Sequence, residues 1–265
     1  MQVADKVFVV TGGGNGIGRE VVLELLARGA RVAAVDLRAT SLEETARLAA
    51  AEPDQLSTHT VDVTDPGAVA ALGPEVRSLH GQVDGLVNVA GIIQRFAPFL
   101  DLETAEIEKV LAVNFWGVVH LTREFLPHLV ERTEASLVNV ASMGAFVPVP
   151  GQAVYGASKA AVKLLTEALY AELRGTAVTV TAVYPGAIGT DIAANSGVGA
   201  PDGEGPEIKT TSPRDAGRQV VDGIEEGAYR VRIGRDATML DRLSRLMPRR
   251  ATDLVARRMQ SLLDG

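Results

Sequence analysis

The fold is decided by residues 7–18, Val7-Phe-Val-Val-Thr-Gly-Gly-Gly-Asn-Gly-Ile-Gly18. The apolar run 7–10 predicts a short buried strand, and the glycines after it predict a tight turn. Residues 17–28 then show the apolar spacing of a helix and end before Gly29. A strand, a glycine loop and a helix in this order present free backbone N–H groups and the positive end of a helix dipole, which together favour a pyrophosphate.

The glycines have a spacing of their own, Gly12-x-x-x-Gly16-x-Gly18. It is neither the G-x-G-x-x-G fingerprint nor the G-x-x-x-x-G-K-[ST] pattern, so a P-loop is excluded. The position between a first strand and a first helix favours a dinucleotide site over a turn without a ligand. The predicted contacts in this loop are Gly12, Gly14, Asn15, Gly16, Ile17 and Gly18.

A carboxylate ends the second predicted strand, 31–36. Asp36 could accept hydrogen bonds from both hydroxyls of an adenosine ribose, and it would repel a 2′-phosphate. It therefore predicts NAD as the cofactor. Arg38 leaves NADP open as the less favoured alternative, because a guanidinium could accommodate the phosphate. Leu37, between the two, is uncharged.

Strands and helices alternate along the chain, and the strands are near-continuous runs of Val, Ala and Leu, as expected for a parallel sheet covered on both faces. Capping patterns predict helix starts at Ser41, Asp65-Pro66 and Ser212-Pro213. We predict one doubly wound, Rossmann-type α/β domain over 1–234, with 235–265 as an amphipathic helical extension of the same domain. The further strands are expected at 56–63, 135–142, 177–186 and 229–234, a strand followed by a turn at 84–91, a helix at 152–174, and one long or two consecutive helices at 103–131.

Composition excludes several classes of protein. The chain has 265 residues and no cysteine, which removes disulfides, thiol nucleophiles and cysteine-ligated metals. Its net charge of −7 argues against a nucleic-acid partner. No apolar stretch fits a signal peptide or a membrane span, so we predict a cytoplasmic protein. The charge is uneven: 228–265 holds nine Arg against four Asp, net +5, which leaves −12 for 1–227.

Tyr155 and Lys159 stand four residues apart near the start of a predicted helix and so share one face. A phenol with a pKa of about 10 needs a drop of about three units, or about 4 kcal/mol, to act as a base near neutral pH. One ammonium at about 4 Å supplies roughly that much, so no metal is required. Ser142 could hydrogen-bond a substrate oxygen, and Asn114 stands mid-helix, where Asn is unfavourable unless it has a bonding task.

These motifs together resemble the classical short-chain dehydrogenase/reductase family, over about residues 4–234. The matching residues are Thr11–Gly18, Asn88-Val-Ala-Gly91, Asn114, Ser142, Tyr155-Gly-Ala-Ser-Lys159, and Pro185-Gly186 with Thr190. The resemblance implies that Tyr155 is the general acid/base, that Ser142 orients the substrate oxygen, and that Lys159 lowers the tyrosine pKa and holds the nicotinamide ribose. It also implies that Asn114 anchors a water in a proton relay. The one departure is Val89, where the family usually has a second Asn, which puts a local sheet contact in doubt.

The resemblance also implies the remaining cofactor contacts. Asp62 and Val63 would meet the adenine, Asn88, Ala90 and Gly91 would flank the cofactor, and Ile188 and Thr190 would bond the carboxamide. Pro185 and Gly186 are further expected cofactor contacts. Apolar faces on the helices that hold Asn114 and Tyr155 would pair subunits in a homotetramer. The residues expected on those faces are Phe115, Trp116, Val119, Val162, Leu165 and Leu169.

The predicted substrate walls are mostly apolar and favour a neutral secondary alcohol or ketone. They comprise Ile92, Ile93, Gln94, Met143, Gly144, Val149 and Gln152, with Arg95 as a possible carboxylate anchor. The leading prediction is an NAD-dependent alcohol/carbonyl oxidoreductase. An NADP-linked carbonyl reductase and a catalytically silent NAD-binding regulator are the alternatives. The four histidines lack ligand spacing, so no metal site is predicted, and Val140 stands where a nucleophile elbow needs glycine.

Two segments stay open. The glycine-rich stretch 187–212 is long for a loop and is expected to act as a lid. The tail 236–263 carries apolar residues at helical spacing among arginines, interrupted at Pro248. We favour an amphipathic pair of helices packed on its own or a neighbouring subunit. A cover for the pocket and a contact with a membrane surface are the functional alternatives.

Overall fold

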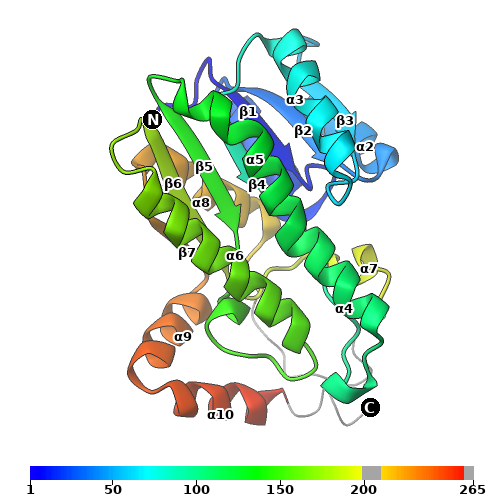
Figure 1. The fold of residues 1–265 in the computed structure, drawn as a ribbon, viewed down its shortest axis with the longest axis vertical. Helices are drawn as coiled ribbons and strands as arrows, with labels where there is room; N and C mark the ends of the chain where they lie inside the picture. The colour runs from blue at the N-terminus through cyan, green and yellow to red at the C-terminus, as the bar shows by residue number, and fades with distance from the viewer. Residues whose placement is uncertain (199–209, 260–265) are drawn as a thin grey trace.

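The computed structural model describes residues 1–198 and 210–259. Seven parallel strands form one sheet in the order β3-β2-β1-β4-β5-β6-β7, with helices on both faces (Figure 1). This confirms the predicted Rossmann-type α/β fold. The order reverses between β1 and β4, which is where open α/β sheets bind their ligands. The strands are β1 (Val7–Thr11), β2 (Arg31–Asp36), β3 (Leu56–Thr60), β4 (Gly85–Asn88), β5 (Ala135–Val140), β6 (Val178–Pro185) and β7 (Arg230–Ile233).

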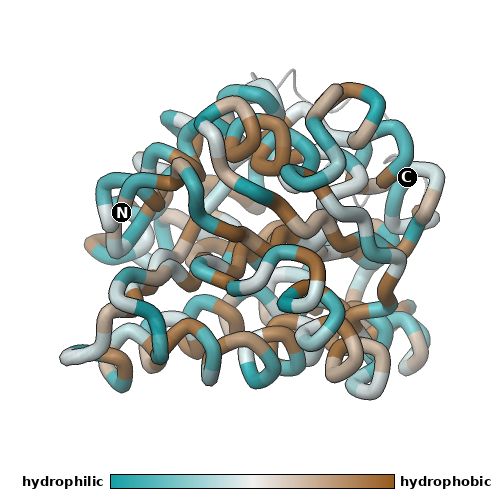
Figure 2. Tube along the Cα trace, turned by 90° about the horizontal axis from the view of Figure 1, so that it is seen from above, coloured by the Kyte–Doolittle hydropathy of each residue, from teal (hydrophilic) through white to brown (hydrophobic). Residues whose placement is uncertain are grey.

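Two apolar clusters hold the layers together, one on each face of the sheet. On one face pack α1 (Gly16–Ala27), α2 (Ala39–Ala49) and α8 (Pro213–Glu226). On the other pack α3 (Pro66–His80), α5 (Gly117–Val130) and α6 (Ala153–Glu172). Along the helices at the border of the molecule, hydrophobic and hydrophilic residues alternate within each turn, as helices with one buried side require (Figure 2).

Helix starts follow the capping patterns in two of three cases. Asp65 accepts from the N–H groups of the first turn of α3, and Ser212 does the same for α8. The capping box predicted at Ser41 is wrong, because α2 begins at Ala39 and Ser41 lies inside its first turn. The third strand was also predicted too long, since β3 ends at Thr60 and the chain then turns toward α3.

The segment 103–131 forms α4 (Thr104–Leu111) and α5, joined without a break by a π-helical turn, Ala112–Trp116. Of the residues expected between subunits, Val162 and Leu169 are instead buried inside this chain. These two side chains pack against residues of the sheet. Trp116 and Leu164 on the same helices are exposed.

Beyond β7 the chain forms α9 (Arg235–Leu246) and α10 (Pro248–Arg258), which project below the sheet in Figure 1. Leu240, Ala251 and Val255 from these helices bury Val147, which lies in the segment before α6. The tail therefore packs on its own chain, against the segment that follows β5. No helix among the described residues combines the length and apolar character needed to cross a bilayer.

Candidate active site

The predicted site residues gather at the carboxyl end of the sheet, around the switch point between β1 and β4. The Thr11 hydroxyl accepts hydrogen bonds from the backbone N–H groups of Val89 (3.1 Å) and Ala90 (3.2 Å), and so ties the two strand ends together. Because backbone N–H groups make this contact, it does not depend on the side chain of Val89.

Three glycines of the loop leave no room for a side chain. Gly12 has a φ of +67°, and a Cβ atom there would lie 3.0 Å from the Ala90 nitrogen. A Cβ on Gly18 would lie 2.1 Å from the Gly12 carbonyl oxygen, so α1 approaches the loop as closely as backbone allows. A Cβ on Gly14 would lie 2.8 Å from a carboxylate oxygen of Asp36. The loop is thus a bare backbone cradle that fits a phosphate group.

Asp36 borders this cradle. Its carboxylate accepts from the Gly14 N–H at 3.0 Å and from the Arg38 N–H at 3.1 Å. Each oxygen keeps a further lone pair for a hydroxyl group. The Arg38 guanidinium turns away and donates to the Asn195 side chain at 2.7 Å, whereas Arg19 donates to the Gly14 carbonyl oxygen. Leu37 is exposed beside Asp36.

Tyr155, Ser142 and Lys159 face one another beneath the end of β5. The Ser142 hydroxyl accepts from the Gly144 N–H at 3.0 Å, which leaves its own proton free to be donated. The buried Lys159 ammonium donates to the Val140 carbonyl oxygen at 2.9 Å and lies 6.0 Å from the centre of the Tyr155 ring. Gly91 makes room for it, since a Cβ there would lie 3.1 Å from Nζ.

Burial sets the ionisation of this group. It raises the pKa of Tyr155, and the hydrogen bond with Ser142 opposes the rise. It also lowers the pKa of Lys159 to about 8. The expected drop of the tyrosine pKa is therefore absent in the protein alone, because both groups are desolvated and the ammonium is aimed at a carbonyl oxygen.

Asn114 lies in the π-helical turn and is fully buried. Its side chain accepts from the Ile92 N–H at 2.8 Å and donates to the Ile92 carbonyl oxygen at 2.9 Å. It also donates to the Ser158 hydroxyl at 2.9 Å. The unfavourable mid-helix Asn thus has the bonding task that its position suggested. It fixes the chain after β4 to the helix that carries Tyr155.

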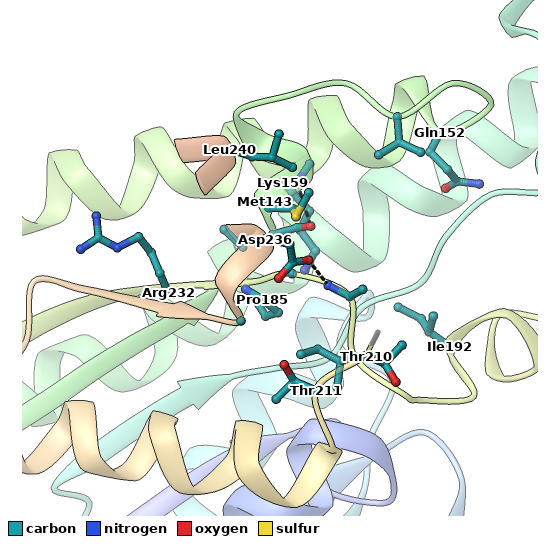
Figure 3. A pocket seen from close by; sticks show the side chains of 18 of the residues that line it. Met143, Gln152, Lys159, Pro185, Ile192, Thr210, Thr211, Arg232, Asp236 and Leu240 are labelled. Carbon is teal, nitrogen blue, oxygen red and sulfur yellow. Dashed lines mark hydrogen bonds between the residues drawn. The ribbon is translucent and has the colours of Figure 1, made fainter. Parts of the chain in front are cut away.

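A cavity of about 1390 Å³ opens beside these residues. Tyr155, Ser142 and Lys159 line it together with Pro185, Gly186, Ile188 and Thr190. Figure 3 shows Lys159 and Pro185 on this wall. Of the expected substrate walls, it contains Ile93, Met143, Gly144, Val149 and Gln152. Gln152 is buried and donates to the Gln94 carbonyl oxygen, while its own carbonyl oxygen has no partner within 1–198 and 210–259.

Other predicted residues lie elsewhere. Gln94 is buried behind the wall, where its side chain accepts from the Tyr155 N–H at 2.9 Å and braces the start of α6. Arg95 pairs with Glu106 at 3.1 Å on the surface and does not line the cavity. Asn88 donates to Asn139 at 2.8 Å across the sheet, and Asp62 bonds Thr64 at an exposed turn.

Asp236, in the first turn of α9, was not predicted as a site residue. Its carboxylate accepts from the Ala187 N–H at 2.8 Å, so the tail holds the loop after β6 (Figure 3). The tail also lines the cavity, as expected if it covers the pocket, which was one of the alternatives for this segment. The tail residues on the cavity wall include Met239, Leu240, Leu254, Val255, Arg258 and Met259. Their apolar spacing was visible, but the surface against which they pack was not.

Of the expected lid, 187–212, the structure describes residues 187–198 and 210–212. It forms the short helix α7 (Ile192–Asn195), and Ser196 accepts from the Ile93 N–H at 3.0 Å, which ties the segment to the cavity wall. Residues 199–209 of that segment lie outside the described part. Within the described residues, no group of three or more His, Asp or Glu side chains could hold a metal ion.

A model of the short chain dehydrogenase family matches residues 6–199. The chain belongs to the short-chain dehydrogenase family. A Mycobacterium tuberculosis (strain ATCC 25618 / H37Rv) protein named "Putative oxidoreductase SadH" is 37% identical over 262 residues, covering 95% of this chain and 94% of the relative. The chain is therefore an oxidoreductase of this family.

Solved structures of family members superpose over nearly the whole chain. A short-chain dehydrogenase from Burkholderia cenocepacia in complex with NADP has a TM-score of 0.81 at 27% identity, covering 96% of this chain and 99% of that one. A 3-ketoacyl-(acyl-carrier-protein) reductase from Brucella melitensis complexed with NADH has a TM-score of 0.78 at 28% identity, covering 87% and 97%. Family members of this fold thus bind either nicotinamide cofactor.

Proposed function

We propose that this chain is an NAD-dependent oxidoreductase that transfers a hydride between a secondary alcohol, or its ketone, and nicotinamide. The observation that carries the proposal is the meeting of Tyr155, Ser142 and Lys159 on the wall of one cavity. A silent NAD-binding regulator, the alternative of a different class, has no need for this set of proton-handling groups.

The bare cradle of Gly12–Gly18 would hold the pyrophosphate, with Asn15 and Ile17 in the same loop. The other proposed contacts are Asp36 and Leu37 at the adenosine ribose, Asp62 and Val63 at the adenine, Asn88, Ala90 and Gly91 along the cofactor, Tyr155 and Lys159 at the nicotinamide ribose, and Pro185, Gly186, Ile188 and Thr190 at the carboxamide. Bound NAD would supply the hydride acceptor.

The proton would pass through Tyr155. In the oxidation direction its oxygen takes the alcohol proton, and in the reduction direction its hydroxyl donates to the ketone oxygen. The raised pKa of Tyr155 favours the neutral phenol, the donor form. Ser142 would donate to the same substrate oxygen, because the bond that it accepts from the Gly144 N–H does not use its hydroxyl proton. The Lys159 ammonium keeps two further N–H groups for ribose hydroxyls.

NAD is preferred over NADP in this proposal because of Asp36. Its carboxylate lies against the Gly14 backbone, and a 2′-phosphate there would meet its negative charge. NADP is the second candidate, since Arg19 and Arg38 are within reach of the same loop. The ratio of kcat/KM values with the two cofactors tests the preference, and a higher value with NADP would reverse it.

Tyr155→Phe tests the chemistry. We expect turnover to fall by about 10² to 10⁴ while NAD binding is kept. A panel of neutral secondary alcohols, followed through nicotinamide absorbance, supplies the substrate. Turnover unchanged in the variant would remove Tyr155 from its role, and no turnover of any alcohol or ketone by the unaltered protein would favour the silent regulator.

We further propose a cytoplasmic homotetramer whose subunits meet through the helices around Asn114 and Tyr155. The exposed Trp116 and Leu164 on these helices support this arrangement. Light scattering tests it, and a mass equal to one chain would contradict it.

A further inference from the structure

We propose that helices α9 and α10, residues 235–258 and hereafter the arm, form a docking surface for an anionic lipid bilayer. The corner between them, Leu246 and Met247, would enter the headgroup region. None of the proposed catalytic or cofactor contacts lies on the outer side of the arm.

Apolar side chains on the outer side of the arm are uncovered. Leu246 is 79% exposed, Met239 46% and Met247 39%. On α9, Arg235, Met239, Leu246 and their neighbours line an outer hollow of about 410 Å³, whose walls also include Thr238, Arg242 and Leu243. Apolar residues that alternate with arginines on one helix face are typical of segments that lie in the plane of a membrane interface.

Charge distinguishes the arm from the rest of the chain. Residues 228–265 carry a net charge of +5, and residues 1–227 carry −12. The buried Asp241 pairs with Arg232 (3.0 Å) and Arg245 (2.8 Å) and anchors α9 to the body. Among residues 1–198 and 210–259, Arg235, Arg242, Arg250, Arg257 and Arg258 make no ion pair.

The difference in charge between the arm and the rest of the chain favours an anionic bilayer as the partner of the docking surface. An anionic surface attracts the arm and repels the acidic body, so it fixes one orientation, and each arginine near such a surface raises the partition about fivefold. A second copy of the chain fits less well. A two-fold contact between two arms would bring +4 against +4, since residues 235–258 hold seven Arg and three Asp and such an interface places the same surface on both sides.

The arm also separates the outer hollow from the catalytic cavity. Arg235, Thr238 and Met239 line both, so about one turn of α9 lies between them. Docking would bring the cavity close to the bilayer, where an apolar alcohol or ketone is concentrated. This last consequence rests on the proposed function, whereas the docking itself does not.

The experiment measures co-sedimentation of the full chain with phosphatidylcholine vesicles, with and without phosphatidylglycerol. The test variant is Arg242→Glu with Leu246→Glu. The matched control is Arg77→Glu with Leu79→Glu on α3, where Leu79 is 61% exposed and the charge change is the same. We expect binding to the phosphatidylglycerol vesicles that weakens with salt, falls at least about tenfold in the arm variant and changes less than about twofold in the control.

Three results would overturn the proposal. They are no sedimentation with phosphatidylglycerol vesicles, an equal loss in both variants, or self-association in the absence of vesicles that the arm variant abolishes, which would assign the surface to a second copy. The milder Arg242→Gln with Leu246→Ser repeats the comparison if a thermal midpoint shows that the first variant unfolds. If the unaltered protein binds the vesicles but turns over no alcohol or ketone, the proposed function is wrong and the docking proposal is unaffected.

Discussion

The nucleotide half and the substrate half of the site are built in opposite ways. Around Gly12, Gly18 and Asp36 the contacts are made by backbone, and an added methyl group would collide with backbone or carboxylate. Around Phe96, Met143 and Leu254 the wall consists of apolar side chains beside open space. The first half therefore tolerates almost no change in shape, whereas the second depends on the total volume of its side chains.

The sharpest way to break the nucleotide half is Gly18→Ala. Its Cβ would lie 2.1 Å from the Gly12 oxygen, so the loop must move away from α1. We expect NAD binding to fall by more than about 100-fold and the free energy of unfolding to drop by about 3 kcal/mol. Calorimetric titration and urea unfolding measure the two effects.

Gly144→Ala in the substrate half is the matched control. The added Cβ would meet its nearest atom, the Ser142 hydroxyl, at 3.4 Å, which is an ordinary contact. NAD affinity should stay within about threefold of the original. If the two glycines behaved alike, the contrast between the halves would be lost.

Lys159→Met, where the halves meet, should stabilise the protein in the absence of cofactor. Burial lowers the pKa of Lys159 from 10.5 to about 8. That shift corresponds to about 3 kcal/mol of destabilisation, which the substitution removes. Loss of the hydrogen bond to Val140 destabilises the variant by about 1 kcal/mol. We therefore expect the free energy of unfolding at neutral pH to rise by about 2 kcal/mol as activity is lost.

The pH dependence of the free energy of unfolding tests the same effect of Lys159. Below pH 8 both states hold the lysine proton and the burial cost is complete. Between about pH 8 and pH 10.5 the folded state has released the proton and the unfolded state still binds it, so stability rises with pH. That slope should vanish in Lys159→Met and persist in Lys163→Met, whose ammonium instead pairs with Glu167 at 3.0 Å. Urea unfolding across this range checks it, and a slope retained in Lys159→Met would contradict the argument.

The two halves also differ in how far the sequence alone predicts them. The glycine loop, Asp36 and the Tyr155–Lys159 pair depend on spacing within one loop or one helix turn, and parallel strands bring such strand ends to one edge of the sheet. The predicted strands and the doubly wound order follow from the same local patterns. Only the ends of elements were misplaced, at α2 and β3, where tertiary packing competes with the local capping signal.

The substrate half depends on contacts between distant segments. Gln94 braces Tyr155 across 61 positions, and Arg95 is drawn to Glu106 instead of a substrate. Asp236 reaches Ala187 across 49 positions. No periodicity reveals such pairings, and an amphipathic tail shows that it will bury one face but not against which surface. The contacts of Gln94, Arg95 and Asp236 could therefore not be predicted from the sequence.

Asp36→Asn sharpens the nucleotide half without changing its shape. The amide removes the negative charge and offers a donor to a 2′-phosphate, so the ratio of kcat/KM for NADP to that for NAD should rise about tenfold, or about 1.4 kcal/mol. Asp62→Asn is the control, because it neutralises an exposed carboxylate at the proposed adenine contact. NAD and NADP share that contact, so the ratio should not move. A ratio unmoved by Asp36→Asn would mean that Asp36 does not set the preference.

The smallest effect is expected for Leu254→Ala in the substrate half. Leu254 is half-buried on the cavity wall, so its truncation should lower the free energy of unfolding by about 1 kcal/mol or less. NAD affinity should not change, because no backbone contact in the glycine loop depends on α10. The KM for bulky apolar alcohols should rise a few-fold, while that for small alcohols stays constant, since only a large substrate reaches the arm. Leu48→Ala, on the exposed side of α2, serves as the control for surface truncation. Two results would contradict this expectation: a change in NAD affinity, or an equal change in KM for small and bulky alcohols. Either would show that a side chain of the substrate half affects the backbone-built nucleotide half, so the two halves are coupled.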